Sequence, residues 1–137
     1  MEKTTTLTEK AASLFLGRNW GNLVDLRTDG SPHVTPVWVD YDGEHVLVNS
    51  AYGRCKVRNI QSDPRVAIEV LPSDDQQSGY VSVTGTAELV DEGADEHIDK
   101  LAKKYLGVEE YPFRSPGEKR VIIRITPERV DAQGVAA

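Results

Sequence analysis

Two Asp-Gly pairs, Asp29-Gly30 and Asp42-Gly43, restrict the folds open to this chain, because such pairs close tight turns between antiparallel strands. Segments rich in apolar and β-branched residues flank them, at residues 21–26, 33–40 and 44–50. Short turns join strands that are neighbours in a sheet. The first part of the chain is therefore predicted to form a three-stranded antiparallel meander.

Residues 7–16 and 92–106 have the apolar periodicity of amphipathic helices, and residues 52–62 read as a short helix. Thr6 and Glu9 read as a capping box for the first helix, and Gly17 as its end. The second helix must stop before Pro64, which disfavours helical backbone at the preceding residue. Gly107 is expected to end the third.

The rest of the chain reads mainly as strands, over residues 65–71, 80–90 and 119–131. Gly85 interrupts the second of these strands and predicts a bulge or bend. The chain then has about six strands and three helices, and the strands are mostly antiparallel. A small barrel suits this set, since closure removes exposed strand edges. We predict a mainly β fold that forms a single domain over residues 1–137.

Composition excludes several classes of protein. The chain has 137 residues, 16 basic and 22 acidic, with a net charge of −6, which argues against a nucleic-acid partner. One cysteine, Cys55, excludes a disulfide scaffold. The three histidines are scattered without metal-ligand spacing, so no metal is expected. No apolar run approaches the ~20 residues of a membrane span, and residues 1–12 lack the apolar core of a signal peptide. A cytoplasmic protein with no membrane partner is expected.

The first candidate site is the strand segment Thr35-Pro36-Val37-Trp38. A proline inside a strand cannot donate a ladder hydrogen bond, so it belongs on an edge strand or at a bulge. The functional alternative is a place where a flat ligand lies against the strand and satisfies its diverted backbone groups. The residues alone leave both interpretations open.

The second candidate site is the stretch from Asn49 to Asn59, which passes from a strand end through a glycine turn into a helix start. Residues 52–66 carry four basic side chains and one acidic one, against the negative balance of the whole chain. Arg54 and Lys56 lie where the helix presents free N–H groups, and Ser50 adds a hydroxyl, so this stretch is a candidate phosphate cradle. A solvated basic helix face is the alternative. The stretch matches neither a P-loop nor a dinucleotide-binding glycine motif.

Two loops, residues 72–78 and 111–117, are candidate walls of a substrate site, because loops on a rigid frame often carry specificity. Tyrosines at 52, 80 and 111 could stack on a ring, although packing is the commoner fate of tyrosine. No Ser-His-Asp set can be recognised, and no catalytic residue is assigned.

Residues 30–71 resemble the flavin and deazaflavin split β-barrel family, the relatives of pyridoxamine 5′-phosphate oxidase. The matching pieces are the P-V-W-V-D strand, D-G-E-x-V-L-V-N-S, G-R-x-K-x-R-N and D-P-R-V, in this order and at this spacing. The chain looks closest to the branch that uses the deazaflavin coenzyme F420. Later segments also fit, so that the resemblance extends over nearly the whole chain.

The resemblance implies a six-stranded antiparallel split barrel of the FMN-binding type, which works as a homodimer with cofactor sites at the interface. The strand that contains Thr35, Pro36 and Val37 would lie along the tricyclic ring. The residues that would hold the cofactor tail, and its phosphate above all, are Asn49, Ser50, Arg54, Lys56 and Asn59.

The implied activity is hydride transfer between coenzyme F420 and a small unsaturated or conjugated substrate, with the difficult chemistry carried by the cofactor. One alternative keeps the fold and binds FMN as a reductase or oxidase. Another is a non-catalytic carrier of a deazaflavin, a flavin or a tetrapyrrole. Pyridoxamine phosphate oxidases have a C-terminal signature rich in tryptophan and arginine. This chain ends RITPERVDAQGVAA, so vitamin B6 oxidation is not expected.

Overall fold

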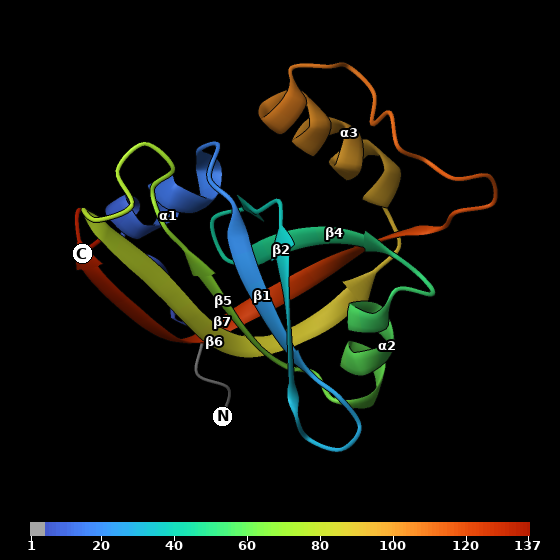
Figure 1. Cartoon of the computed structure of the whole chain (residues 1–137), viewed down its shortest axis with the longest axis horizontal. Helices are drawn as coiled ribbons and strands as arrows, with labels where there is room; N and C mark the ends of the chain where they lie inside the picture. The colour runs from blue at the N-terminus through green and yellow to red at the C-terminus, as the bar shows by residue number, and fades with distance from the viewer. Residues whose placement is uncertain (1–4) are drawn as a thin grey trace.

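The fold is described from a computed structural model, which describes residues 5–137 (Figure 1). The first four residues, which the predicted single domain includes, lie outside the described residues. In chain order the elements are α1 (Glu9–Leu16), β1 (Gly21–Leu26), β2 (Pro32–Val37), β3 (Asp40–Tyr41), β4 (Val46–Ala51), α2 (Cys55–Ser62), β5 (Arg65–Val70), β6 (Gly79–Val90), α3 (Ala94–Leu106) and β7 (Arg120–Gly134). None of the helices in this part of the chain is both long enough and apolar enough to span a membrane.

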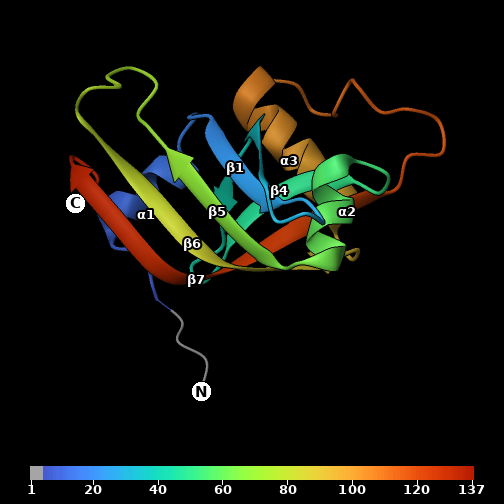
Figure 2. The same ribbon diagram turned by 60° about the horizontal axis from the view of Figure 1, so that its bottom comes forward.

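One antiparallel sheet contains all seven strands that the described residues form, in the order β2-β1-β5-β6-β7-β4-β3. The long strands β6 and β7 form its centre, and the sheet curls around the core as a half-barrel (Figures 1 and 2). The prediction of a mainly β, split-barrel fold is confirmed. The predicted count of six strands is wrong by one, because Asp40 and Tyr41 form a short strand of their own.

The core lies in the concave side of this sheet. Strands β1, β5 and β6 alternate between buried and exposed positions, which is the pattern of a sheet with one face on the core. Phe15 of α1 is fully buried and packs among strand residues such as Leu23 and Ile123. Helix α1 therefore covers one end of the half-barrel.

The predicted meander is wrong at its third strand. β1 pairs with β2, but β4 pairs with β3 and β7, so the chain crosses between opposite ends of the strand order after Val37. The crossing occurs at Trp38 and Val39, which leave the ladder. The Val39 N–H bonds the Tyr105 hydroxyl at 3.0 Å, and its carbonyl accepts from Lys104 Nζ at 2.5 Å. Side chains of α3 thus satisfy the backbone groups that a neighbouring strand would otherwise pair.

Two further expectations need correction. The cap of α1 is Thr8, whose hydroxyl accepts from the Ala11 N–H at 3.1 Å, and not Thr6. The barrel is not closed by hydrogen bonds, since no ladder joins β2 to β3 in the part of the chain that the structure describes.

The bulge at Gly85 is confirmed, and a Cβ there would lie 2.0 Å from the Thr126 carbonyl oxygen.

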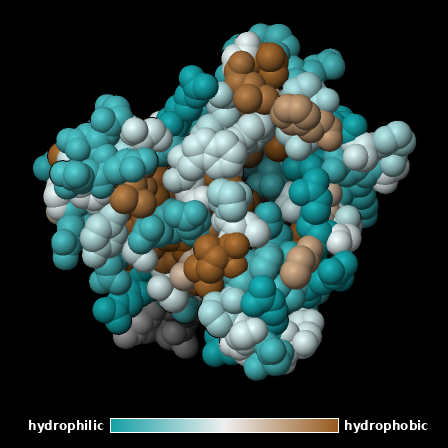
Figure 3. All heavy atoms as spheres, viewed as in Figure 1, coloured by the Kyte–Doolittle hydropathy of each residue, from teal (hydrophilic) through white to brown (hydrophobic). Residues whose placement is uncertain are grey.

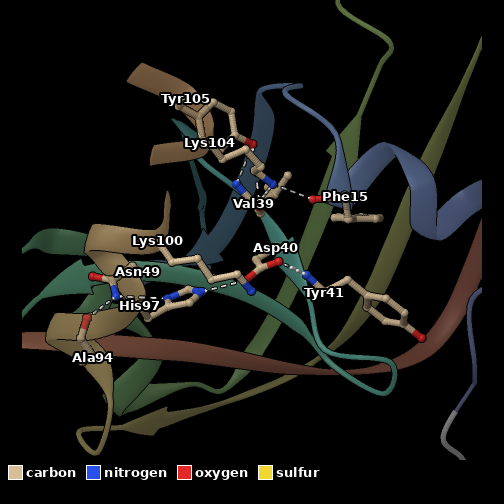
Figure 4. A network of polar contacts seen from close by, with 10 residues as sticks. All are labelled: Phe15, Val39, Asp40, Tyr41, Asn49, Ala94, His97, Lys100, Lys104 and Tyr105. Carbon is tan, nitrogen blue, oxygen red and sulfur yellow. Dashed lines mark hydrogen bonds and ion pairs between the residues drawn. The ribbon is translucent and has the colours of Figure 1, made fainter. Parts of the chain in front are cut away.

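A set of polar contacts, which we call the fastening cluster, holds α3 against the crossing segment (Figure 4). It comprises Asp40, His97, Lys100, Lys104 and Tyr105. Asp40 is 3% exposed, and its Oδ2 accepts from His97 Nε2 at 3.1 Å and Lys100 Nζ at 3.0 Å. Burial alone raises the pKa of the Asp40 carboxyl, but these hydrogen bonds outweigh it and lower the pKa to about 2.

The far end of α3 is tied in the same way. Lys104 Nζ donates to the carbonyls of Phe15 and Val39, and burial lowers its pKa to about 8. The Tyr105 hydroxyl donates to the Asn19 carbonyl at 2.6 Å while it accepts from Val39. Helix α3 is therefore fixed over the place where the strand order is broken, and this placement opens a cavity beside it.

Candidate functional site

A cavity of about 290 Å³ lies between α3, the start of α2, the end of β2 and the loop that precedes β7. It brings together segments that are far apart in the sequence. Its lining residues are Trp20, Pro36, Val37, Trp38, Asn49, Ser50, Arg54, Lys56, Ile98, Leu101, Tyr111, Phe113 and Arg120.

One wall of the cavity is apolar and aromatic. Pro36 and Val37 line this wall and come from β2, so the predicted edge position of the proline is confirmed. The ligand predicted to lie against this strand stays a prediction. Trp38 stacks on Tyr105, with ring centroids 5.1 Å apart and planes 4° apart, and it meets Tyr111 edge-on at 6.0 Å. Rigid rings packed in this way make a flat, preformed surface that suits a planar ligand.

Another part of the wall is basic and is built by the turn into α2. Gly53 has a φ of +94°, which favours glycine, and this turn delivers Arg54 and Lys56 to the cavity. Helix α2 starts with no side-chain cap and no acidic residue in its first turn, which leaves N–H groups and the positive end of the helix dipole available to an anion. The predicted glycine turn and helix start are confirmed.

The pKa of Lys56 reflects the positive charges gathered around it. Burial lowers its pKa, and the charges of Arg54 and Arg120 lower it further, against an opposing effect of Asp25. The other two basic side chains of residues 52–66 face elsewhere. Arg58 donates to the Gly53 carbonyl, and Arg65 pairs with Asp63 at 2.7 Å.

Three buried polar atoms on the cavity residues have no hydrogen-bond partner among the residues described: Ser50 Oγ, Trp38 Nε1 and Arg120 Nη1. Ser50 is 3% exposed and Arg120 is 5% exposed. Buried polar groups are nearly always paired, so each unpaired one needs an explanation. A ligand with hydrogen-bonding oxygens that enters this cavity would supply the missing partners.

Asn49 connects the cavity to the fastening cluster (Figure 4). Its Nδ2 donates to the Ala94 carbonyl at 2.8 Å and lies 3.1 Å from His97 Nδ1. Its Oδ1 accepts from Arg120 Nε at 2.9 Å. The polar atoms of Asn49 are thus engaged by protein groups, although the residue lines the cavity.

The cavity collects six of the eight predicted cofactor-binding residues: Pro36, Val37, Asn49, Ser50, Arg54 and Lys56. The remaining two are not among its lining residues. The Thr35 hydroxyl is buried and has no partner in the described chain. Asn59 lies behind the cations, where its Nδ2 donates to Asp25 Oδ1 at 2.7 Å and so ties α2 to β1.

Sequence reasoning did not find several lining residues, above all Trp20, Ile98, Leu101 and Arg120. Arg120 reaches the cavity because β7 pairs with β4 in a register that sets Arg120 opposite Ala51. No local pattern encodes that register. The loop expected at residues 111–117 does supply two aromatic side chains, Tyr111 and Phe113, whereas no described residue of the loop at 72–78 lines the cavity.

The described residues contain no group of three or more histidine, cysteine, aspartate or glutamate side chains arranged to hold a metal ion. The donors of the cavity are instead cationic and neutral N–H and O–H groups beside aromatic rings. This set fits the anionic tail and the flat ring of a flavin-type cofactor.

A model of the pyridoxamine 5′-phosphate oxidase family matches residues 7–134. The chain belongs to this family. The match spans the half-barrel, the cavity and α3, and it agrees with the resemblance found in residues 30–71.

Solved structures of similar proteins support this family assignment. An F420 reductase is 30% identical, with a TM-score of 0.78, and the match covers 91% of this chain and 98% of that one. A putative pyridoxamine 5′-phosphate oxidase from Listeria innocua is 24% identical, with a TM-score of 0.64 and coverage of 82% and 86%. A conserved hypothetical protein from Mycobacterium tuberculosis, Rv2991, is also 24% identical, with a TM-score of 0.70 and coverage of 98% and 91%. The last two show the fold alone.

Proposed function

We propose that this protein is an oxidoreductase that transfers a hydride between coenzyme F420 and a small unsaturated or conjugated organic substrate. The observation that carries the proposal is the cavity, in which an aromatic wall faces a basic helix start. The similarity to an F420 reductase over nearly the whole chain supports the choice of cofactor. The cofactor, when bound, supplies the hydride chemistry.

The protein's part is to bind and orient. Pro36 and Val37, with Thr35 behind them, form the edge against which the ring lies. Arg54 and Lys56 neutralise the tail phosphate, since guanidinium and ammonium groups make strong charge-assisted hydrogen bonds to phosphate.

Three further residues complete the predicted set. Ser50 contributes a buried hydroxyl that lacks a partner in the described structure. Asn49 lines the same wall, and Asn59 holds the helix that carries the cations.

We further propose that a homodimer completes the site. The cavity of about 290 Å³ lies at the lower limit of the roughly 300–1,000 Å³ typical of ligand sites. A cofactor with a long tail therefore extends beyond one subunit. Figure 3 shows apolar side chains that reach the surface over strands β1 and β2, where Val34 is 58% exposed, which supports a protein partner on this face. Sedimentation velocity should show a dimer, and a monomer at tens of micromolar concentration would contradict it.

Arg54 and Lys56 suit the phosphate monoester of FMN equally well, so an FMN-dependent reductase or oxidase is the second candidate. A carrier of a deazaflavin, a flavin or a tetrapyrrole uses the same cavity without turnover. The cytoplasmic location stays a prediction from the sequence.

The test is a fluorescence titration of the purified protein with F420 and, separately, with FMN. Saturable micromolar binding of F420 that is tighter than binding of FMN supports the proposal. Turnover of the reduced cofactor with a panel of enones, quinones and biliverdin then separates an enzyme from a carrier. No saturable binding of F420 would contradict the proposed cofactor.

A further inference from the structure

Arg120 is a charged side chain that the predicted site residues do not include, and its environment is unusual. It is 5% exposed, and its guanidinium lies 5.0 Å from the centre of the Tyr111 ring. Its Nε is bonded to Asn49, yet its buried Nη1 makes no hydrogen bond, although Glu118 Oε1 lies 3.3 Å away. Asn49, Tyr111 and an ion pair with Glu118 thus hold the guanidinium in the wall of the cavity, and its Nη1 still lacks a hydrogen bond. A guanidinium held in this way is preorganised to receive an anion.

Arg120 also lies close to the other cations. Glu118 Oε1 is within 3.5 Å of Arg54 Nη2 and within 3.3 Å of Arg120 Nη1. Both guanidinium groups are thus within reach of one carboxylate oxygen. The charge of Arg120 also acts on Lys56. Arg54 and Arg120 are therefore close enough to share one oxygen ligand, and Lys56 lines the same cavity.

The orientation of Arg120 is set from a distance. Asn49 Nδ2 has two acceptors, the Ala94 carbonyl and His97 Nδ1, so its Oδ1 must face Arg120. His97 accepts at Nδ1 because its Nε2–H donates to Asp40. The contacts thus form one directed chain from β3 through α3 to the cavity (Figure 4).

We propose that Arg120 is a third phosphate-binding residue, beside Arg54 and Lys56, and that Asp40, His97 and Asn49 position it. The proposal rests on the proposed function, because it assigns a group in the same site. Asn49 acts through Arg120 and not by contact with the phosphate. The ligand class is a planar ring compound with a phosphate on its tail.

The first experiment compares ring compounds with and without phosphate: FMN against riboflavin, and F420 against its phosphate-free deazaflavin. Arg120→Gln should weaken binding of the phosphorylated compounds about tenfold or more and leave the phosphate-free ones unchanged. Arg124→Gln is the matched control, because Arg124 lies on the same strand and pairs with Glu88 on the surface at 2.6 Å. Equal losses for both kinds of compound, or no loss, would overturn the proposal. Should Arg120→Gln fail to fold, Arg120→Lys, which keeps the charge and loses the fork, must still weaken phosphate-dependent binding.

A double-mutant cycle tests the positioning role. Asn49→Ala alone should weaken binding of the phosphorylated compound severalfold, and it should add almost nothing in the Arg120→Gln background. Independent, additive losses would show that Asn49 acts on its own and would overturn the positioning role. Thermal unfolding of each variant reports stability separately.

Inorganic phosphate separates this inference from the proposed function. If the wild-type protein binds none of the ring compounds, the proposed function fails, while Arg120 can still be tested. Phosphate should then shift the Arg120 Nε–H signal in a ¹⁵N–¹H spectrum at millimolar concentrations, and Asn49→Ala should abolish the shift. A signal that does not move at tens of millimolar phosphate would overturn the inference.

Discussion

The fastening cluster and the cavity wall are two regions that share helix α3, but they differ in how many of their buried polar groups have hydrogen-bond partners. Both carboxylate oxygens of Asp40 have partners, and the Tyr105 hydroxyl both donates and accepts. On the cavity wall, Ser50 Oγ and Trp38 Nε1 are buried and have no hydrogen-bond partner in the described structure. A buried unpaired group costs about 1–3 kcal/mol, so the difference is energetically large.

This difference distinguishes a structural polar cluster from a binding site. The fastening cluster stabilises the fold because its groups are satisfied within the chain. The cavity wall keeps donors free, and a ligand that satisfies them gains the free energy that the empty site forgoes. Substitutions in the fastening cluster should therefore lower the stability of the fold, and substitutions in the cavity wall should lower the affinity for the cofactor.

The largest effect is expected from the basic wall. Removal of two charge-assisted phosphate contacts by Arg54→Gln with Lys56→Met should weaken cofactor binding by about 3 kcal/mol, or roughly a hundredfold. The free energy of unfolding should change little, because like charges crowd Lys56, and the contact of Arg54 with Glu118 is long, at 3.5 Å, and half exposed. Fluorescence titration and urea unfolding measure the two quantities.

The matched control removes the same number of charges from the same stretch of chain. Arg58→Gln with Arg65→Gln leaves the cavity wall intact, because both side chains face elsewhere. Affinity should stay within about twofold of wild type once long-range attraction is screened by salt. A loss as large as that of the first pair would mean that net charge, and not the wall, governs binding.

The basic wall was predictable from sequence because its parts are local. A strand end, a glycine turn and a helix start follow one another within residues 49–59, and each has its own signal. Arg120 and Trp20 were not predictable, since Arg120 joins the cavity through the β4–β7 register and Trp20 packs edge-on against Tyr105 of α3. The meander failed for a related reason: the Asp-Gly turn at 42–43 does join neighbouring strands, but the partner is a two-residue strand after a break that Lys104 and Tyr105 stabilise.

The next largest effect is expected in the fastening cluster. Tyr105→Phe keeps the ring that stacks on Trp38 but leaves the Val39 N–H and the Asn19 carbonyl without their partner. The free energy of unfolding should fall by about 2–3 kcal/mol, while cofactor affinity stays within about threefold. Urea unfolding and titration of the same preparations test both. A large loss of affinity at unchanged stability would reverse the roles given to the two regions.

A smaller effect is expected from acid. The pKa of Asp40 is about 2 in the folded protein and about 3.9 in an unfolded chain, so its carboxylate stabilises the fold fully above about pH 4. This contribution, about 2 kcal/mol, should be lost as the pH falls from about 4 to about 2. The measurement is the free energy of unfolding at pH 5 and pH 2.5 for wild type and Asp40→Asn. The variant should show the weaker pH dependence, and identical slopes would contradict the assigned stabilisation.

The smallest effect is expected at the rim of the cavity, where Phe113 is 63% exposed and meets Tyr111 edge-on at 5.6 Å. Phe113 offers no polar atom, so its contribution to cofactor binding should be slight. Phe113→Ala should raise the KM for the organic substrate about threefold, by loss of part of an exposed apolar contact, and leave cofactor affinity unchanged.

Phe113→Leu, which keeps most of the apolar surface, should restore the KM. A cofactor affinity that falls with Phe113→Ala would instead place this loop against the ring. In that case the loop before β7, which also carries Glu118 and leads into Arg120, would contact the cofactor. The molecule would then have a third, apolar region that acts on cofactor affinity.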